Sequence, residues 1–101
     1  MIHKDFSEFV FPNYKPAPFQ LSHGKGVYLY DTENRDYLDF SSGIAVNNLG
    51  HCHPQVVEAI QRQSQKLLHC SNLFWNQPSG ELAEKLVNSS FADRVFFTNS
   101  G

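Results

Sequence analysis

A short apolar run at residues 94–98 leads directly into Asn99-Ser100-Gly101. The run is rich in residues that favour strands, and two small polar residues and a glycine follow it. In α/β proteins, a strand with this ending precedes a helix whose free N–H groups and positive dipole end bind a phosphate. The pattern therefore predicts the α/β class, with a phosphate site at Ser100 and Gly101. An ordinary exit from a strand into a loop would look the same, and that alternative stays open.

A β-hairpin is predicted nearer the start of the chain. Residues 27–31 and 36–40 are rich in aromatic and aliphatic side chains, and they flank four polar residues at 32–35. Asn34 stands where the hairpin loop needs a residue in the left-handed conformation, which asparagine tolerates. We interpret residues 23–26, which include two glycines, as a turn before the hairpin.

Two helices are predicted after the hairpin. The first begins at His53-Pro54, because proline is favoured at the first helical position, and its apolar residues at helical spacing continue to about His69. The second begins between residues 76 and 80 and is broken by residues 88–90.

Two segments carry no regular pattern. Residues 1–20 contain three prolines among five aromatics, which predicts an extended arm that lies on another surface, such as a second subunit. Tyr14 in this arm is either a packing residue or a positioned hydroxyl. Residues 41–50 are small and mildly apolar, which predicts a loop that approaches another group closely.

Composition excludes several classes of protein. The net charge is −2, the pI is about 6.2 and there is no basic run, so nucleic acid and acidic membranes are poor candidate partners. No segment approaches the roughly 20 apolar residues of a membrane span, and the first residues do not resemble a signal peptide. Two cysteines make no disulfide framework, which favours a reduced, cytoplasmic protein. A chain of 101 residues could bury a modest apolar core.

A metal site is the main alternative for the histidines and cysteines. The candidate ligands are His51, Cys52, His53, His69 and Cys70. Adjacent ligands rarely close a tetrahedron, and the spacings typical of zinc sites are absent, so we expect no metal. We expect His53 to cap the helix that Pro54 begins, and both cysteines to be small buried hydrophobes. A nucleophilic cysteine beside a histidine is less favoured, because no third orienting group is evident.

Taken in order, the phrases of this sequence resemble the class III aminotransferases, which use pyridoxal phosphate. The likeness runs from about Phe11 onward, and within the class it is greatest to the acetylornithine aminotransferases. Seven phrases carry it: GKGVYLYD at 24–31, YLDF at 37–40, SGIAVN at 42–47, LGHCHP at 49–54, SNLF at 71–74, ELAEKL at 81–86 and RVFFTNSG at 94–101.

This resemblance implies a type I aminotransferase fold. Residues 1–75 would form an N-terminal arm and the small-domain hairpin and helices, and residues 76–101 would begin the large cofactor-binding domain with its first strand. The family is dimeric and binds pyridoxal 5'-phosphate at the subunit interface. The reaction implied is amino transfer between N-acetylornithine and 2-oxoglutarate in arginine biosynthesis. Ornithine, succinylornithine or 4-aminobutyrate aminotransferases are alternatives, as is a small non-catalytic metal-binding or interaction module.

The resemblance also implies roles for particular residues. Ser100 and Gly101 match the start of the family's phosphate-binding turn, and Tyr14 matches an aromatic residue near the substrate. Ile44 stands where ornithine δ-aminotransferases carry a tyrosine that contacts the α-amino end, and an aliphatic residue there suits an acetylated substrate. The loop at Ser71 would approach the partner subunit's cofactor. The five lysines match no Schiff-base lysine of the family, so we expect these residues to be the N-terminal part of a larger enzyme, inactive alone.

Overall fold

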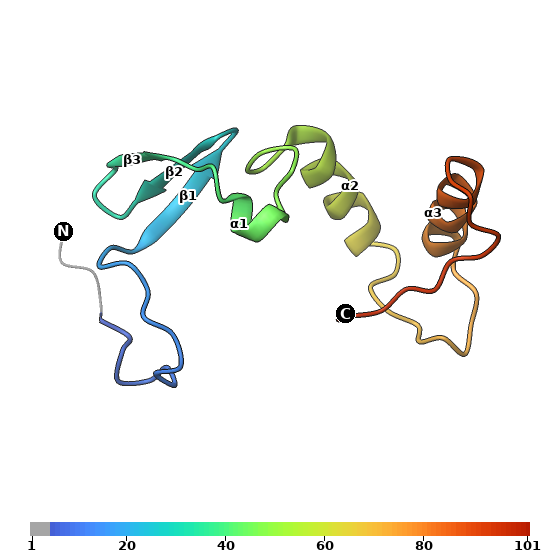
Figure 1. Cartoon of the computed structure of the whole chain (residues 1–101), viewed down its shortest axis with the longest axis horizontal. Helices are drawn as coiled ribbons and strands as arrows, with labels where there is room; N and C mark the ends of the chain where they lie inside the picture. The colour runs from blue at the N-terminus through green and yellow to red at the C-terminus, as the bar shows by residue number, and fades with distance from the viewer. Residues whose placement is uncertain (1–4) are drawn as a thin grey trace. The chain divides into compact units, whose positions relative to one another are not determined.

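The computed structural model describes residues 5–101 and divides into two compact units, Met1–Arg62 and Gln63–Gly101 (Figure 1). The helices and strands along the chain are β1 (Leu21–Lys25), β2 (Tyr28–Asp31), β3 (Asp36–Leu38), α1 (Ser42–Ala45), α2 (Pro54–Ser64) and α3 (Gln77–Asn88). The three strands and α1 belong to the first unit, and α3 belongs to the second.

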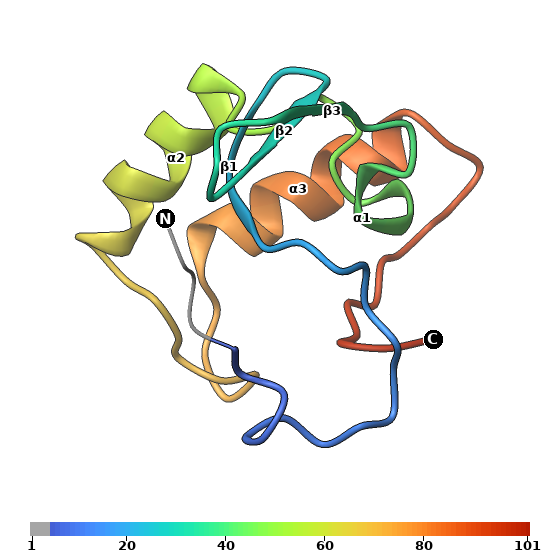
Figure 2. The same cartoon turned by 90° about the vertical axis from the view of Figure 1, so that its left-hand side faces the viewer.

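The first unit is built on an antiparallel sheet in the order β1-β2-β3, whose strands lie side by side in Figure 2. The predicted hairpin is confirmed as β2 and β3, in which Leu29 is paired with Tyr37. Asn34 has φ +64°, as expected for the hairpin loop. The prediction of a turn at residues 23–26 is wrong, because most of this segment belongs to β1. Its ladder bonds to β2 outweigh the low strand propensity of glycine and lysine.

The most buried side chain of the described residues is the carboxylate of Asp31. Among the described residues no hydrophobic side chain is buried, and Asp31, at 2% exposed, is the one buried polar residue. Its carboxylate accepts hydrogen bonds from the backbone N–H groups of Glu33 and Arg35, from Arg35 Nε and from the Tyr37 hydroxyl. Burial alone would raise the pKa of this carboxyl, but the hydrogen bonds outweigh it and hold the pKa well below its usual range. The hairpin loop therefore folds around a buried, charged carboxylate.

Helix α2 begins where the sequence predicts. The His53 Nδ1 atom accepts a hydrogen bond of 3.2 Å from the Gln55 N–H group, which confirms His53 as the cap. The helix ends at Ser64, well before the predicted end near His69. The Leu67 N–H group returns to the Gln63 carbonyl, and the Gln63 side-chain amide donates to the Leu67 carbonyl. This reciprocal pair closes the last turn.

Helix α3 confirms both predicted boundaries. Asn76 is its N-cap, and the Asn76 Oδ1 atom accepts from the Ser79 N–H group at 3.0 Å and from the Ser79 hydroxyl at 2.7 Å. The helix ends at Asn88, and the side chains of the two serines after it bond to the backbone of its last turn. The hydroxyl groups of Ser89 and Ser90 donate to carbonyls of the last turn.

The other segments lack regular structure. Residues 94–98 were predicted to be a strand, but they form none, because no described strand of the second unit offers them ladder partners. Residues 5–20 contain neither helix nor strand, as their prolines require, and the first four residues of the predicted arm lie outside the described part. Within residues 5–101, every helix is too short or too polar to span a bilayer.

Candidate cofactor and substrate site

Helix α1 is a single turn of left-handed backbone. The φ angles of Ser42, Gly43, Ile44 and Ala45 are +54°, +65°, +62° and +61°. The sequence predicted a loop without helical period here. The structure instead shows one helical turn, whose hand is opposite to that of an ordinary α-helix. Each non-glycine residue in this conformation costs roughly 1–2 kcal/mol, so the turn needs support from its surroundings. The Ile44 side chain is 92% exposed, and the turn therefore displays it away from the described residues.

The support comes from the Asp39 carboxylate. Its Oδ1 atom accepts from the Ser41 N–H group at 3.0 Å, from the Ser41 hydroxyl at 2.8 Å and from the Ser42 N–H group at 3.1 Å. Its Oδ2 atom lies 2.6 Å from His51 Nε2. The His51 hydrogen bond and those from the serines lower the pKa of Asp39 to about 2 despite its burial. The carboxylate is thus charged and saturated with donors.

This pair was missed by reasoning from sequence alone. His51 was considered only as a metal ligand, and Asp39 only as a residue of the hairpin. The signal available was local: Asp39 stands two residues before Ser41, and an aspartate carboxylate commonly accepts the backbone N–H group two residues further on. Nothing in the sequence indicated that His51 would reach the other oxygen.

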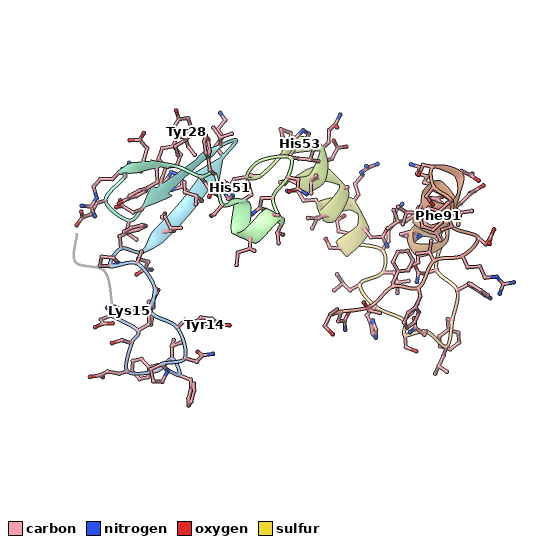
Figure 3. All side chains as sticks on the ribbon, in the orientation of Figure 1. Tyr14, Lys15, Tyr28, His51, His53 and Phe91 are labelled. Carbon is pink, nitrogen blue, oxygen red and sulfur yellow. The ribbon has the colours of Figure 1, made fainter. Side chains whose placement is uncertain are left out.

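Tyr14, the second residue predicted to bind substrate, lies on the arm (Figure 3). Its side chain is 83% exposed, and its hydroxyl makes no hydrogen bond within residues 5–101. Figure 3 shows Tyr14 and His51 on separate segments of the first unit. The described residues therefore leave both Tyr14 and Ile44 accessible to a ligand, without joining them into one pocket.

The second unit contains a hollow beside the predicted phosphate turn. Its volume is about 720 Å³, and its lining residues are His69, Ser71, Asn72, Leu73, Phe96, Phe97, Thr98 and Asn99. The structure thus places the loop at 71–73 opposite the segment that precedes Ser100. A second hollow of about 600 Å³ shares Asn72, Leu73, Phe96 and Phe97.

The donor set beside this hollow suits a phosphate. Within the described residues, the backbone N–H groups of Asn99, Ser100 and Gly101 donate no hydrogen bond, and neither does the Ser100 hydroxyl. The Thr98 hydroxyl donates to the Ser100 carbonyl at 2.8 Å. No carboxylate lines the described hollow. Backbone N–H groups and a hydroxyl are donors that suit a phosphate. Ser100 and Gly101 follow Asn99 in the chain but do not themselves line the hollow, and the lining contains no lysine.

A metal centre finds no support in the geometry. Across residues 5–101, no group of three or more histidine, cysteine or acidic side chains is close enough to hold a metal ion. His51 is paired with Asp39, and His53 caps α2. The expectation of two buried cysteines is wrong, since Cys52 is exposed and Cys70 is only partly covered.

Comparison with known proteins decides the family. Residues 9–101 match the family described as aminotransferase class-III. The chain belongs to the class-III aminotransferases. Enzymes of this family depend on pyridoxal phosphate, which, when bound, supplies an electron sink for amino transfer.

Similar relatives agree. The chain is 52% identical over 96 residues to an acetylornithine/succinyldiaminopimelate aminotransferase of Buchnera aphidicola, covering 95% of this chain and 24% of the relative. It is 53% identical over 93 residues to an acetylornithine aminotransferase of Neisseria meningitidis, covering 92% of this chain and 23% of the relative. The chain thus spans about a quarter of the length of these relatives.

Solved structures confirm the fold class. A Plasmodium falciparum ornithine δ-aminotransferase matches with a TM-score of 0.83 and 38% identity, over 88% of this chain and 23% of that one. An N-acetylornithine aminotransferase of Stenotrophomonas maltophilia matches with a TM-score of 0.79 and 43% identity, over 84% of this chain and 24% of that one. Both are aminotransferases, so the predicted α/β class and its N-terminal placement hold.

Proposed function

We propose that the full-length protein is an aminotransferase that moves an amino group between N-acetylornithine and 2-oxoglutarate, in arginine biosynthesis. The observation that carries this proposal is the identity of about half the residues, over more than nine tenths of this chain, to acetylornithine aminotransferases. The aliphatic and exposed Ile44 agrees with it, because an acetylated α-amino group has no charge to be recognised.

Each site residue has a role in this proposal. The N–H groups and hydroxyl at Ser100 and Gly101 bind the phosphate of pyridoxal phosphate, as donors at a chain turn can. Tyr14 and Ile44 contact the amino donor. Residues 1–75 belong to the arm and small domain, and residues 76–101 begin the large domain. The protein works as a homodimer in the cytoplasm, with the arm lying on its partner.

A second candidate is an ornithine aminotransferase. The P. falciparum ornithine δ-aminotransferase has the higher TM-score of the two structures above, although its sequence identity is lower. The two reactions differ in whether the α-amino group of the donor is acetylated, so the side chain at position 44 is the place to separate them.

Kinetics with the full-length gene product and added pyridoxal phosphate test the proposal. Glutamate formation from 2-oxoglutarate is measured with N-acetylornithine and with ornithine as donors. We expect a higher kcat/KM for N-acetylornithine, and we expect I44Y to shift the ratio towards ornithine by about tenfold, the scale of one gained or lost contact. I44V is the matched control, since it keeps an aliphatic side chain and should leave the ratio near that of the wild type.

The outcomes separate the candidates. A wild-type preference for ornithine would replace the first candidate with the second. Absence of glutamate with both donors, in a protein that shows the visible absorbance of bound pyridoxal phosphate, would refute both.

A further inference from the structure

The left-handed turn at α1 is the most strained segment of the described chain. Four consecutive positions, residues 42–45, have positive φ angles that favour glycine, yet only Gly43 is a glycine. A β-branched residue at φ +62° is an outlier that persists only where neighbouring groups hold it. The hydrogen bonds within the turn, from the Ile44 and Ala45 N–H groups to the Ser41 carbonyl, close it locally and do not attach it to the sheet.

Both members of the Asp39–His51 pair are tied to the end of the sheet. The Asp39 N–H group donates to the Val27 carbonyl at 2.8 Å. His51 and Gly26 exchange two backbone hydrogen bonds, of 2.7 and 3.1 Å. Gly26 and Val27 form the turn between β1 and β2. The Asp39–His51 pair therefore attaches α1 to this one turn of the sheet.

The His51 side chain packs closely against Gly24 of β1, which has no side chain of its own. A Cβ atom added at Gly24 would lie 2.9 Å from both Cβ and Cγ of His51, which shows how closely the ring packs on β1. The side chains of Asp39 and His51 are 6% and 14% exposed. The pair is therefore largely shielded from water, and its hydrogen bond is not lost to competing solvent.

We propose that Asp39 and His51 are positioning residues for the amino donor: they hold the left-handed turn against the β1–β2 turn and thereby fix where Ile44 meets the substrate. This inference rests on the proposed aminotransferase function. Neither Asp39 nor His51 touches the substrate. Asp39 sets the conformation of residues 41–42, and His51 sets the orientation of Asp39.

The test compares three variants of the full-length gene product loaded with pyridoxal phosphate. H51A removes the ring, and H51Q keeps an amide donor near the position of Nε2. H23A is the matched control, because His23 lies on the same sheet and its ring contacts Tyr30 and Ser22 instead of Asp39. We expect H51A to raise KM for N-acetylornithine about tenfold while kcat changes less than about threefold, since a misplaced contact weakens donor binding. H51Q should recover most of the loss, and H23A should match the wild type.

Amide hydrogen exchange supplies a readout that does not depend on activity. In H51A, the amides of residues 44–47 should exchange about tenfold faster, while the β2–β3 ladder amide of Leu29 should keep its wild-type rate. Unchanged exchange at 44–47 overturns the inference, whether or not the enzyme is active. Faster exchange with an unchanged KM in an active enzyme also overturns it, because the pair would then be structural only. An inactive wild type that shows the exchange effect refutes the proposed function and leaves the link between the pair and the turn intact.

Discussion

Gly24 offers a test of how rigidly His51 is held against the sheet. In G24A, the new Cβ would lie 2.9 Å from two carbons of the His51 side chain and 3.0 Å from Leu29 Cδ2. The His51 Cβ atom is bonded directly to the backbone and no side-chain rotation moves it away, so the backbone of His51 or of β1 must shift. Gly24 is not in the left-handed region, and alanine therefore adds no backbone strain at this position.

The expected magnitude follows from two opposing effects. Overpacking of this kind costs about 1–3 kcal/mol. Replacing glycine by alanine at an ordinary φ recovers about 0.4–1 kcal/mol, because the unfolded chain becomes less flexible. Near the middle of both ranges, the local structure is destabilised by about 1–2 kcal/mol, which corresponds to opening that is about 5–30-fold more frequent.

Native-state hydrogen exchange of the full-length gene product measures this opening. The reporter amides are those of Gly26 and His51, which are paired with each other's carbonyls. Both should exchange about 5–30-fold faster in G24A than in the wild type. G80A is the matched control, since a Cβ at Gly80 of α3 meets no described atom within 4 Å, and it should leave the reporters unchanged. Wild-type rates in G24A would refute the close packing of His51 on Gly24.

Three further predictions concern the helix cap, pH and the cofactor. N76A should destabilise α3 by about 1 kcal/mol in denaturant unfolding, because the Ser79 N–H group loses its acceptor, whereas N76D should stay close to the wild type. Because folding lowers the pKa of Asp39 from 3.8 to about 2, its stabilising effect is complete above pH 3.8 and is lost as the pH falls towards 2. Unfolding midpoints across that interval should fall less steeply in D39N than in the wild type, and equal slopes would contradict the assignment. S100A should lower the affinity for pyridoxal phosphate tenfold or more in an absorbance titration, since a hydrogen bond to a charged group contributes about 1.5–3 kcal/mol. S100T keeps the hydroxyl, and an affinity as low as that of S100A would argue against a role for this group.

Features that depend on a few neighbouring residues were predictable. Pro54 marks the start of α2, Asn76 caps α3, and Asn34 takes the left-handed conformation of the hairpin loop. In each case the side chain acts on backbone within a few residues of itself, so the local pattern contains the physical cause. The end of α2 was mispredicted, because the Gln63 side chain closes the helix while the apolar spacing continues beyond it.

Features that depend on pairing across the chain were not predictable. Residues 23–26 were predicted to be a turn, but most of them belong to β1, since β2 supplies the hydrogen-bond partners of that strand. Residues 94–98 read as a strand but form none, since no described partner of the second unit pairs with them. Strand formation is decided by the partner as much as by the propensity of the segment.

For the candidate site, the sequence alone indicated the family and the aliphatic character of Ile44, and it predicted a phosphate turn at Ser100 and Gly101. The tertiary structure decided how Ile44 is presented. Its left-handed turn exists because Asp39 holds it and His51, twelve residues further along the chain, holds Asp39. The free energy that stabilises such a strained backbone comes from groups brought together only by folding. No local sequence pattern therefore predicts the left-handed turn.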